Sequence, residues 1–273
     1  AVPVEMERAI TEELDKLGNV RSLVPVIQAR NDTKIPIESD IGAGEWVAEL
    51  GTITPANMTL AQAEAKAYKA CAAVSASVEI LSGDAVVDMN AYLGKVLGRR
   101  LAQTLETAYC NGDGSGKPKG LFQLTGGAGN YTEAVTSDTV IDFWYTLPAQ
   151  YRQSPSASWL CNDASISVIR KLKDDNGRYL WIPSERYSDI RDGVSGTIMG
   201  TKVTINNYAQ GSVANPEFVL ADFSLAYRIY DRGGTQMLSD PFTNAANGQV
   251  NLYSYRRTDG LQIIADAMSR WAA

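Results

Sequence analysis

The 273-residue chain contains no histidine and only three cysteines, Cys71, Cys110 and Cys161. The missing imidazole excludes Ser-His-Asp and Cys-His catalysis, histidine-containing metal sites and imidazole proton shuttling. The odd number of cysteines, at unrelated spacings, predicts neither a disulfide framework nor a zinc site. Carboxylate or lysine chemistry is the catalytic chemistry left open, and no convergent polar constellation in the sequence supports it.

Long apolar runs and an excess of positive charge are also absent. No apolar stretch approaches the roughly 20 residues that span a bilayer, so no membrane partner is expected. The formal net charge of −6 argues against a surface that neutralises a phosphate backbone along its length. With 45% hydrophobic residues the chain can bury one large core or two modest ones, and any nucleic-acid contact is expected to be local.

The stretch from Ile35 to Ala65 has neither lysine nor arginine. Its acidic residues are Glu38, Asp40, Glu45, Glu49 and Glu64. Trp46 lies between glycines there, and the glycines and prolines leave few residues for an independent core. Two interpretations stay open. The stretch is a surface loop, or it is a two-stranded flap that reaches a neighbouring subunit, with Trp46 as an anchor and the acids facing cations.

A long helix is the clearest element that the sequence predicts. No proline occurs between Asp84 and Cys110, and apolar positions recur every three or four residues, which predicts a helix roughly 40 Å long. Gly94 and Gly98 lie in its apolar stripe, where each glycine costs about 1 kcal/mol relative to alanine. We expect them to let the helix pack closely on the strand predicted at 66–81, whose alternate positions are small and apolar.

The helix ends in a glycine-rich turn, NGDGSGKPKG, from Asn111 to Gly120. A phosphate-binding loop does not fit, because the glycines of the motif are four apart rather than five and proline follows the lysine. A calcium loop does not fit, because Phe122 stands where the twelfth position requires glutamate. The simplest interpretation is a C-terminal helix turn with Asn111 or Gly112 in the left-handed conformation, and no cofactor or metal is expected.

Around this helix the sequence predicts further helices and strands. Helices are expected at 3–17, at 137–152 with Ser137 or Asp138 as the cap, and at 164–175 with Asn162 or Asp163 as the cap. The extended segment 20–27 contains Pro25 and is therefore expected at a sheet edge. Other strands are expected at 158–161, 197–206, 216–222, 226–231, 248–257 and 260–264.

Taken in order, these pieces resemble the major capsid protein of tailed bacteriophages with the Hong Kong 97 fold. The most specific match is the helix end and turn ETAYCNGDGSGKPKGLF, with Glu106 followed by Asn111, Gly112, Asp113, Gly114, Gly116, Pro118 and Gly120. KLKDDNGRYLWIP, IMGTKVTIN, FVLADFSLAYRIYDRGG and RRTDGLQIIADAM follow in the same order as in that family. The resemblance covers nearly the whole chain.

This resemblance implies an α+β fold with four regions. They are an N-terminal arm (1–31), an extended E-loop (32–66), a peripheral domain with the long spine helix and an antiparallel sheet (67–118 and 232–273), and an axial domain (119–231). The glycine turn then joins the peripheral and axial domains. The E-loop residues expected at an inter-subunit contact are Glu38, Asp40, Glu45, Trp46 and Glu49, and their candidate basic partners are Arg99, Arg100, Arg256 and Arg257.

The function that the resemblance implies is structural rather than enzymatic. Copies of the chain are expected to assemble, in the host bacterial cytoplasm, as hexamers and pentamers of an icosahedral virion capsid around double-stranded DNA. DNA contacts are expected to be weak and local, at inward cations such as Lys95 and Arg99. The other implied partners are a scaffold segment, a maturation protease, a portal and a decoration protein, and a start at Ala1 fits the mature, processed product.

Two alternatives remain beside this function. An encapsulin-type nanocompartment shell shares the fold and encloses cargo enzymes, and a carboxylate- or lysine-based enzyme is the remote third. Some members of the resembled family also join an E-loop lysine to an asparagine with the help of a glutamate. Here the stretch 35–65 has no lysine, and Tyr255 stands about where that glutamate is, although Asn247 is near the asparagine position. We therefore expect no covalent cross-links.

Overall fold

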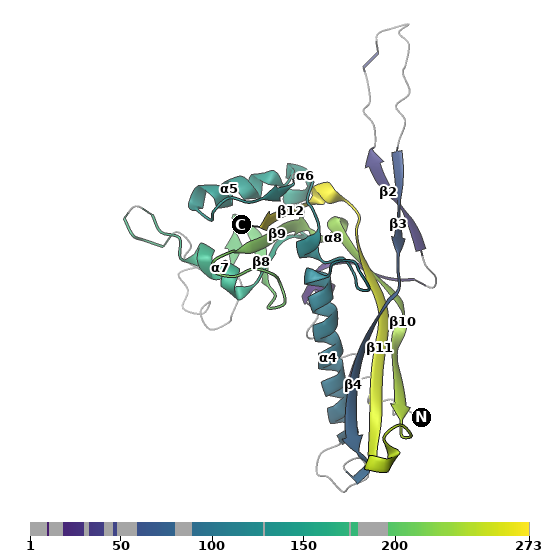
Figure 1. The fold of residues 1–273 in the computed structure, drawn as a ribbon. Helices are drawn as coiled ribbons and strands as arrows, with labels where there is room; N and C mark the ends of the chain where they lie inside the picture. The colour runs from purple at the N-terminus through teal and green to yellow at the C-terminus, as the bar shows by residue number, and fades with distance from the viewer. Residues whose placement is uncertain are drawn as a thin grey trace.

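The computed structural model has an elongated part and a rounded part, which lie side by side in Figure 1. It describes Ile10 and residues 19–29, 33–40, 46–47, 59–79, 89–127, 129–174, 176–179 and 196–272. The helix expected at 3–17 lies outside the described residues except for Ile10, which is helical and completely buried.

The elongated part is a long helix packed along a four-stranded sheet (Figure 1). The helix is α4 (Met89–Asn111), and the first five residues of its predicted range lie outside the described residues. The strand order is β1-β10-β11-β4; β1 pairs with β10 in parallel and the other pairings are antiparallel. These strands are β1 (Val26–Gln28), β4 (Tyr68–Ser77), β10 (Tyr227–Asp240) and β11 (Gln249–Gln262).

Strand β4 has the small-residue face that the sequence predicted. Ala72 and Ala76 are buried, Ala70 and Val74 are half-buried, and the residues that alternate with them up to Ser75 are exposed. Successive side chains of a strand point to opposite faces of the sheet, so the buried set forms one face. This face joins the same core as α4, whose buried leucines are Leu93, Leu97, Leu101 and Leu105.

The buried stripe of α4 is wider than predicted. Gly94 and Gly98 are buried as expected, whereas Ala91 and Ala108 are only half-buried and Leu97 and Tyr109 are completely covered. The cause is a second set of contacts, because α4 also packs against α2 (Asn19–Leu23) and against the short 3-10 helix η1 (Leu121–Gln123). A helix covered from two directions buries more than one narrow stripe.

The segment 20–27 differs from its prediction in its first half. A short helix, α2, stands where an extended chain was expected, and β1 begins only after Pro25. β1 is the edge strand of its sheet, as the proline predicted. Val20 is completely buried against α4, and this tertiary contact outweighs the preference of valine for extended structure.

The rounded part is built on a six-stranded sheet with the order β5-β12-β9-β6-β8-β7. Its strands are β5 (Asn130–Tyr131), β6 (Ala157–Cys161), β7 (Thr197–Ile198), β8 (Thr201–Ile205), β9 (Glu217–Asp222) and β12 (Met268–Ala272). Its helices are α5 (Ser137–Thr146), α6 (Ala149–Arg152) and α7 (Asp163–Arg170). Helix α8 (Phe223–Ala226) joins β9 to β10. The 3-10 helices η2 (Ala245–Asn247) and η3 (Ala265–Ala267) precede and follow β11.

Local capping explains where the two longer helices of this part begin. Asn162 caps α7, as predicted, by accepting a hydrogen bond from the Ser165 amide at 2.7 Å. The cap of α5 is Thr136, one residue before the predicted Ser137, because Thr136 and Thr139 form a reciprocal capping box.

Both faces of the six-stranded sheet are buried. On β6, Trp159 points into a core of aromatic rings under α5 and α7, while its neighbour Leu160 points into the core that contains α4. In the aromatic core the ring centroids of Phe143 and Trp271 are 5.1 Å apart, and those of Phe143 and Trp159 are 5.4 Å apart. The two parts of the molecule therefore share a core.

The C-terminal strand lies in a different sheet from the other strands of the segment 232–273. β12 pairs with β9 and β5, so residues 268–272 belong to the six-stranded sheet and not with the rest of 232–273. Completely buried Trp271 holds this strand against Phe218. β10 begins at Tyr227, inside the predicted axial range, and the strands predicted at 248–257 and 260–264 are one continuous strand, β11.

The acidic stretch forms a two-stranded flap at its base. β2 (Thr33–Asp40) and β3 (Thr59–Ala65) pair in antiparallel register and project from the elongated part in Figure 1. The two-stranded form that the flap interpretation predicted is therefore confirmed for these residues, and its contact with a neighbouring subunit stays a prediction.

We predict that leucine at Gly94 or Gly98 pushes α4 away from its buried neighbours. Overpacking of this kind costs about 1–3 kcal/mol, so the free energy of unfolding should fall while the chain stays soluble, and assembly should be lost first. Urea unfolding followed by circular dichroism, with sedimentation velocity for assembly, measures both effects. Lys95→Leu, on the exposed side of the same helix turn, is the control. Wild-type stability and assembly of Gly94→Leu and Gly98→Leu would contradict the close-packing role.

Candidate functional site

The glycine-rich turn is a tight hairpin that returns the chain along the end of α4. The Gly112 amide donates to the Ala108 carbonyl at 2.8 Å, and the Gly120 amide donates to the Gly112 carbonyl at 2.8 Å. Asp113 and Lys119 form an antiparallel bridge between these two points. The turn thus closes on itself immediately before η1, which carries the chain into the rounded part.

Two kinds of glycine build this hairpin. Gly114 and Gly116 have positive φ angles of 81° and 69°. The left-handed conformation was predicted for Asn111 or Gly112, and that prediction is wrong. Gly112 and Gly120 are needed for close backbone approach. A Cβ on Gly112 would lie 1.9 Å from the Pro118 carbonyl oxygen, and one on Gly120 would lie 2.4 Å from the Cys110 carbonyl oxygen.

Three hydrogen bonds to other segments hold the hairpin in place. The Asn111 amide group donates to the Tyr208 carbonyl at 2.7 Å, which ties the end of α4 to the chain after β8. Tyr68 on β4 donates to the Gly114 carbonyl at 3.0 Å, and Tyr227 on β10 donates to the Lys119 carbonyl at 2.8 Å. The turn is therefore fixed to both sheets at once, which is the geometry of a joint.

Glu106, one turn before the end of α4, is a buried carboxylate at the centre of this joint. It accepts hydrogen bonds from the Val20 amide at 3.1 Å and from the Asn206 side chain at 2.9 Å. Burial raises its pKa, and the bonds from Val20 and Asn206 partly offset that rise. One side chain therefore connects α2, α4 and the end of β8.

A second buried carboxylate, Asp231 on β10, is held between two arginines. Arg21 of α2 donates to it, and Arg256 of β11 donates to it at 2.7 Å. Burial opposes the ionisation of Asp231, but the hydrogen bond and charge of Arg21 and the charge of Arg256 outweigh it, so its pKa is lowered. Arg256 is thus buried and paired with a carboxylate of its own subunit, and its expected contact with a neighbouring E-loop stays a prediction.

A third buried carboxylate, Asp259 on β11, anchors the base of the flap. It accepts from the amide of Lys66, the residue after β3, at 2.5 Å and from the Gly260 amide at 2.8 Å. Burial raises its pKa to about 6, against the opposing effect of these bonds. The connection between the flap and the sheet is therefore held partly by a carboxylate whose pKa is raised to about 6.

The predicted flap contacts are only partly among the described residues. Glu38 and Asp40 lie on β2 beside a register shift, but their side chains, like the whole of Glu45 and Glu49, lie outside the described residues. Trp46 is fully exposed in this single chain.

The predicted cations occupy different surfaces. Arg99 and Arg100 are on the exposed side of α4, and Arg100 donates to the Ala73 carbonyl at 2.7 Å. An open groove of about 840 Å³ between α4, β4 and the turn is lined by Arg100 and Lys117 and by no acid among its described residues. Arg257 is exposed on β11, on the opposite face of the sheet from buried Arg256.

Arg257 belongs to a row of cations across the four-stranded sheet. It is the direct partner of Lys69 on β4 and of Arg232 on β10. Directly paired residues lie on the same sheet face, so the three cations share one face. The Lys69 ammonium lies 4.4 Å from the centre of the Tyr255 ring, so an aromatic surface continues the row. Such a face is complementary to acids.

The described residues hold no metal-ligating cluster, and the buried thiols are not nucleophiles. No group of three or more potential ligands comes together among them. Cys110 and Cys161 are buried and free, and burial raises the pKa of Cys161 to about 12. No helix in the described part of the chain is long and apolar enough to cross a membrane.

The sequence did not single out Arg21, Asp231 or Asp259, although they hold the joint and the flap. Asp231 ends the run AYRIYD and Asp259 lies between two predicted strands, so each charge interrupts an otherwise extended segment. That interruption was the available signal. Glu106 was recognised only as a residue shared with a family.

The raised pKa of Asp259 predicts a pH dependence of stability. Between its ordinary pKa near 4 and its folded pKa of about 6 the folded chain binds the additional proton, so this group makes the fold more stable as pH falls. Asp259→Asn keeps the acceptor oxygen without the charge. Its stability relative to the wild type should therefore be highest at pH 7.5 and should decrease towards pH 5, as measured by urea unfolding. Exposed Asp240, whose pKa is lowered, is the control, since Asp240→Asn should give a constant difference over this range. A constant difference for Asp259→Asn as well would contradict the assignment.

Comparison with known proteins agrees with this architecture. The structure is similar to a chain from the capsid of a native GTA particle, and the match covers 94% of this chain and 90% of that chain, at 25% sequence identity and a TM-score of 0.80. The empty GTA particle capsid gives 23% identity, the same coverage and a TM-score of 0.79. A chain from Mycobacterium phage Adephagia gives 15% identity, 94% and 89% coverage and a TM-score of 0.68. No curated protein matches the chain.

A family model describes almost the whole sequence. The model of the phage capsid family matches residues 1–268. Together with the capsid structures, this match confirms the resemblance and the α+β Hong Kong 97 fold, and it indicates a structural rather than an enzymatic protein of the virion capsid. The chain belongs to the phage capsid family.

Proposed function

We propose that this chain is the major capsid subunit of a phage head, and that its copies form hexamers and pentamers of an icosahedral shell around double-stranded DNA. The observation that carries this proposal is the family match over residues 1–268, with a fold similar to capsid chains over 94% of the sequence. The charge supports an interior that holds DNA loosely, because a net charge of −6 disfavours tight binding of phosphates.

The joint around α4 suits a subunit that must occupy both kinds of ring. Glu106 and the glycine hairpin fix the rounded part to the elongated part through a shared core. The flap, in contrast, meets the body through a short connection held by Asp259. A rigid body with a separately anchored flap lets the same chain make similar contacts in five-membered and six-membered rings.

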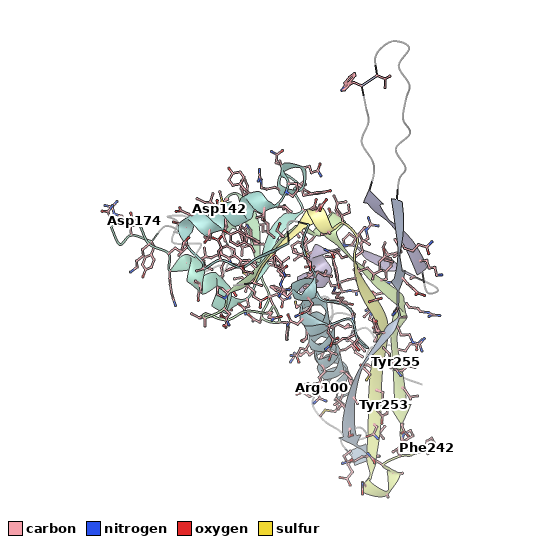
Figure 2. All side chains as sticks on the ribbon, turned by 45° about the horizontal axis from the view of Figure 1, so that its top comes forward. Arg100, Asp142, Asp174, Phe242, Tyr253 and Tyr255 are labelled. Atoms are coloured by element: carbon pink, nitrogen blue, oxygen red, sulfur yellow. The ribbon has the colours of Figure 1, made fainter. Side chains whose placement is uncertain are left out.

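The seat that we propose for a neighbour's flap is the cation row Lys69, Arg257 and Arg232. Figure 2 shows Tyr253 and Tyr255 along this sheet, with Arg100 on the α4 side. Arg100 reaches the edge of this sheet, where it donates to the Ala73 carbonyl and lines a groove together with Tyr253. An acidic flap with an exposed Trp46 complements a face that has cations beside aromatic rings.

Electron microscopy and nuclease protection test the function. The expected result is closed icosahedral particles that contain nuclease-protected double-stranded DNA when they are purified from cells producing the complete phage. Particles that contain a protein cargo and no DNA would support the nanocompartment alternative instead. Protein that forms no shell under these conditions would overturn the proposal.

Charge reversal tests the flap contact. Glu45→Lys with Glu49→Lys should lower the shell yield, because two attractive contacts become repulsive, and the yield should depend on salt in the opposite sense from the wild type. Sedimentation at 50 mM and 500 mM salt measures both effects. Adding Lys69→Glu and Arg257→Glu should restore assembly, whereas adding Lys95→Glu and Lys202→Glu, which make the same change in charge at exposed positions away from the row, should not. Wild-type yield and salt dependence of the first variant would refute the contact.

A further inference from the structure

Strand β4 ends the four-stranded sheet, and its outer edge has no strand partner among the described residues (Figure 1). No backbone group outside the sheet bonds to the backbone of Lys69–Ser75 in the described part of the chain. The pairing with β11 is continuous from Tyr68 to Ser77, without a bulge and without a proline. Bulges, prolines and charges usually protect an edge strand, and β4 has only the charge of Lys69. Such a regular, open edge is a place where another strand can pair.

The pairing register identifies the backbone groups of β4 that point outward. The Val78 amide donates to the Gly248 carbonyl at 2.9 Å, in the same register as the ladder between β4 and β11. In an antiparallel ladder, pairs that exchange hydrogen bonds alternate with pairs that do not. The even-numbered residues of β4 therefore bond to β11, and the outward amides are those of Lys69, Cys71, Ala73 and Ser75. The Ala73 carbonyl agrees with this assignment, because it accepts from Arg100 of α4 at 2.7 Å.

Three hollows follow this edge. One of about 240 Å³ lies between Lys69 and the glycine hairpin, the groove of about 840 Å³ lies between Cys71 and α4, and one of about 460 Å³ lies beside Ser75. Arg100 crosses the line of hollows where it reaches Ala73, and Figure 2 shows it at the border between α4 and β4. A strand advances about 3.3 Å per residue, so the stretch from Lys69 to Ala73 has room for an added strand of about five residues.

The charged side chains that line the three hollows are all cationic. They are Lys69, Arg100 and Lys117, and none of the described lining residues is an acid. Asp113 lies 3.7 Å from Lys117, but both side chains are largely exposed, and such a pair contributes little. The α4 wall of the groove is polar rather than apolar; its side chains include Gln103, Thr104 and Thr107. The edge is therefore complementary to an extended segment that carries carboxylates.

We propose that the outer edge of β4 binds an extended acidic segment of a second protein by strand addition, with its carboxylates facing Arg100 and Lys117. Strand addition obtains affinity from main-chain hydrogen bonds and selects side chains by their alternation. A second copy of the same edge is a poor occupant, because the cations of both copies would then meet and repel. The contact needs only one chain, so it does not depend on the proposed ring and shell formation.

Fluorescence anisotropy with synthetic peptides tests the charge of the occupant. The probe is a fluorescein-labelled octapeptide of alternating threonine and glutamate, and the control peptide alternates threonine and lysine. The purified full chain at low salt should bind the glutamate peptide at least about tenfold more tightly than the lysine peptide. Arg100→Gln with Lys117→Gln should reduce this preference to about threefold or less. Lys95→Gln with Lys202→Gln, at exposed positions that do not line the hollows, should leave it unchanged.

Backbone methylation of the peptide distinguishes strand pairing from attraction between charges. Alternate amides of an extended peptide point to opposite edges, so methyl groups on the threonine amides block one edge and methyl groups on the glutamate amides block the other. One of these two peptides should lose affinity at least about tenfold, and the other should stay within about threefold of the unmethylated peptide. Equal affinity of the two methylated peptides would overturn strand addition, because attraction between charges does not depend on which amides are free.

The same edge can be blocked from the protein side. Cys71→Pro removes an outward amide and leaves the bonds to β11 in place, so it should weaken binding of the glutamate peptide at least about tenfold. Cys71→Val keeps the amide and is the matched control, and thermal melts show whether each variant is folded. Hydrogen exchange is the independent readout. The amides of Lys69 and Ala73 should exchange rapidly in the free chain and slowly in the presence of the peptide.

The possible failures are distinguishable. Wild-type affinity of Cys71→Pro, or binding of the peptide without protection of these amides, overturns the site. If Cys71→Pro does not fold, the methylated peptides and hydrogen exchange decide the question. Tighter binding of a peptide with the sequence of residues 35–50 overturns the assignment to a second protein in favour of a neighbouring copy. Failure of the chain to form shells overturns the proposed function and leaves this contact unaffected.

Discussion

The burial of one side of α4 in a core that both sheets share is the constraint on which the rest of the molecule depends. Leu97, Leu101 and Tyr109 are completely covered, and the core that they enter also contains Leu160 and Val219 of the six-stranded sheet. Because protein interiors are close-packed, neither sheet can shift along the helix without opening voids. The elongated and rounded parts therefore keep a fixed relation, and the glycine hairpin exists to turn the chain sharply where this core ends.

Buried carboxylates complete what the apolar core cannot specify. Glu106 selects the position of α2 and of the segment after β8, Asp231 selects the pairing of α2 with β10 and β11, and Asp259 selects the exit of the flap. A buried charge is tolerated only where hydrogen bonds or counter-charges meet it. Such groups consequently allow one arrangement of the segments that they join, whereas apolar packing alone allows several of similar energy.

Local pattern was sufficient for elements whose cause is local. The alternation of β4, the Asn162 cap of α7, the edge position after Pro25 and the long proline-free helix all follow from neighbours in the sequence, and each was predicted. The close packing at Gly112 and Gly120 was not predicted, because these positions require glycine only where the backbones of Pro118 and Cys110 approach them across the turn. The residues around Trp271 likewise show no strand pattern, and β12 is held in the sheet because the Trp271 ring packs in the aromatic core.

The sequence by itself determined the class of the protein. The absence of histidine excluded imidazole chemistry, and the order of motifs around the glycine turn resembled the phage capsid family, to which the chain belongs. The tertiary structure decided which charges are available for contacts. Arg256 and Arg257 are adjacent in sequence, yet one is buried against Asp231 and the other is exposed in a cation row, because strand register assigns alternate residues to opposite faces. Register depends on partners far away in the chain, and no local pattern contains it.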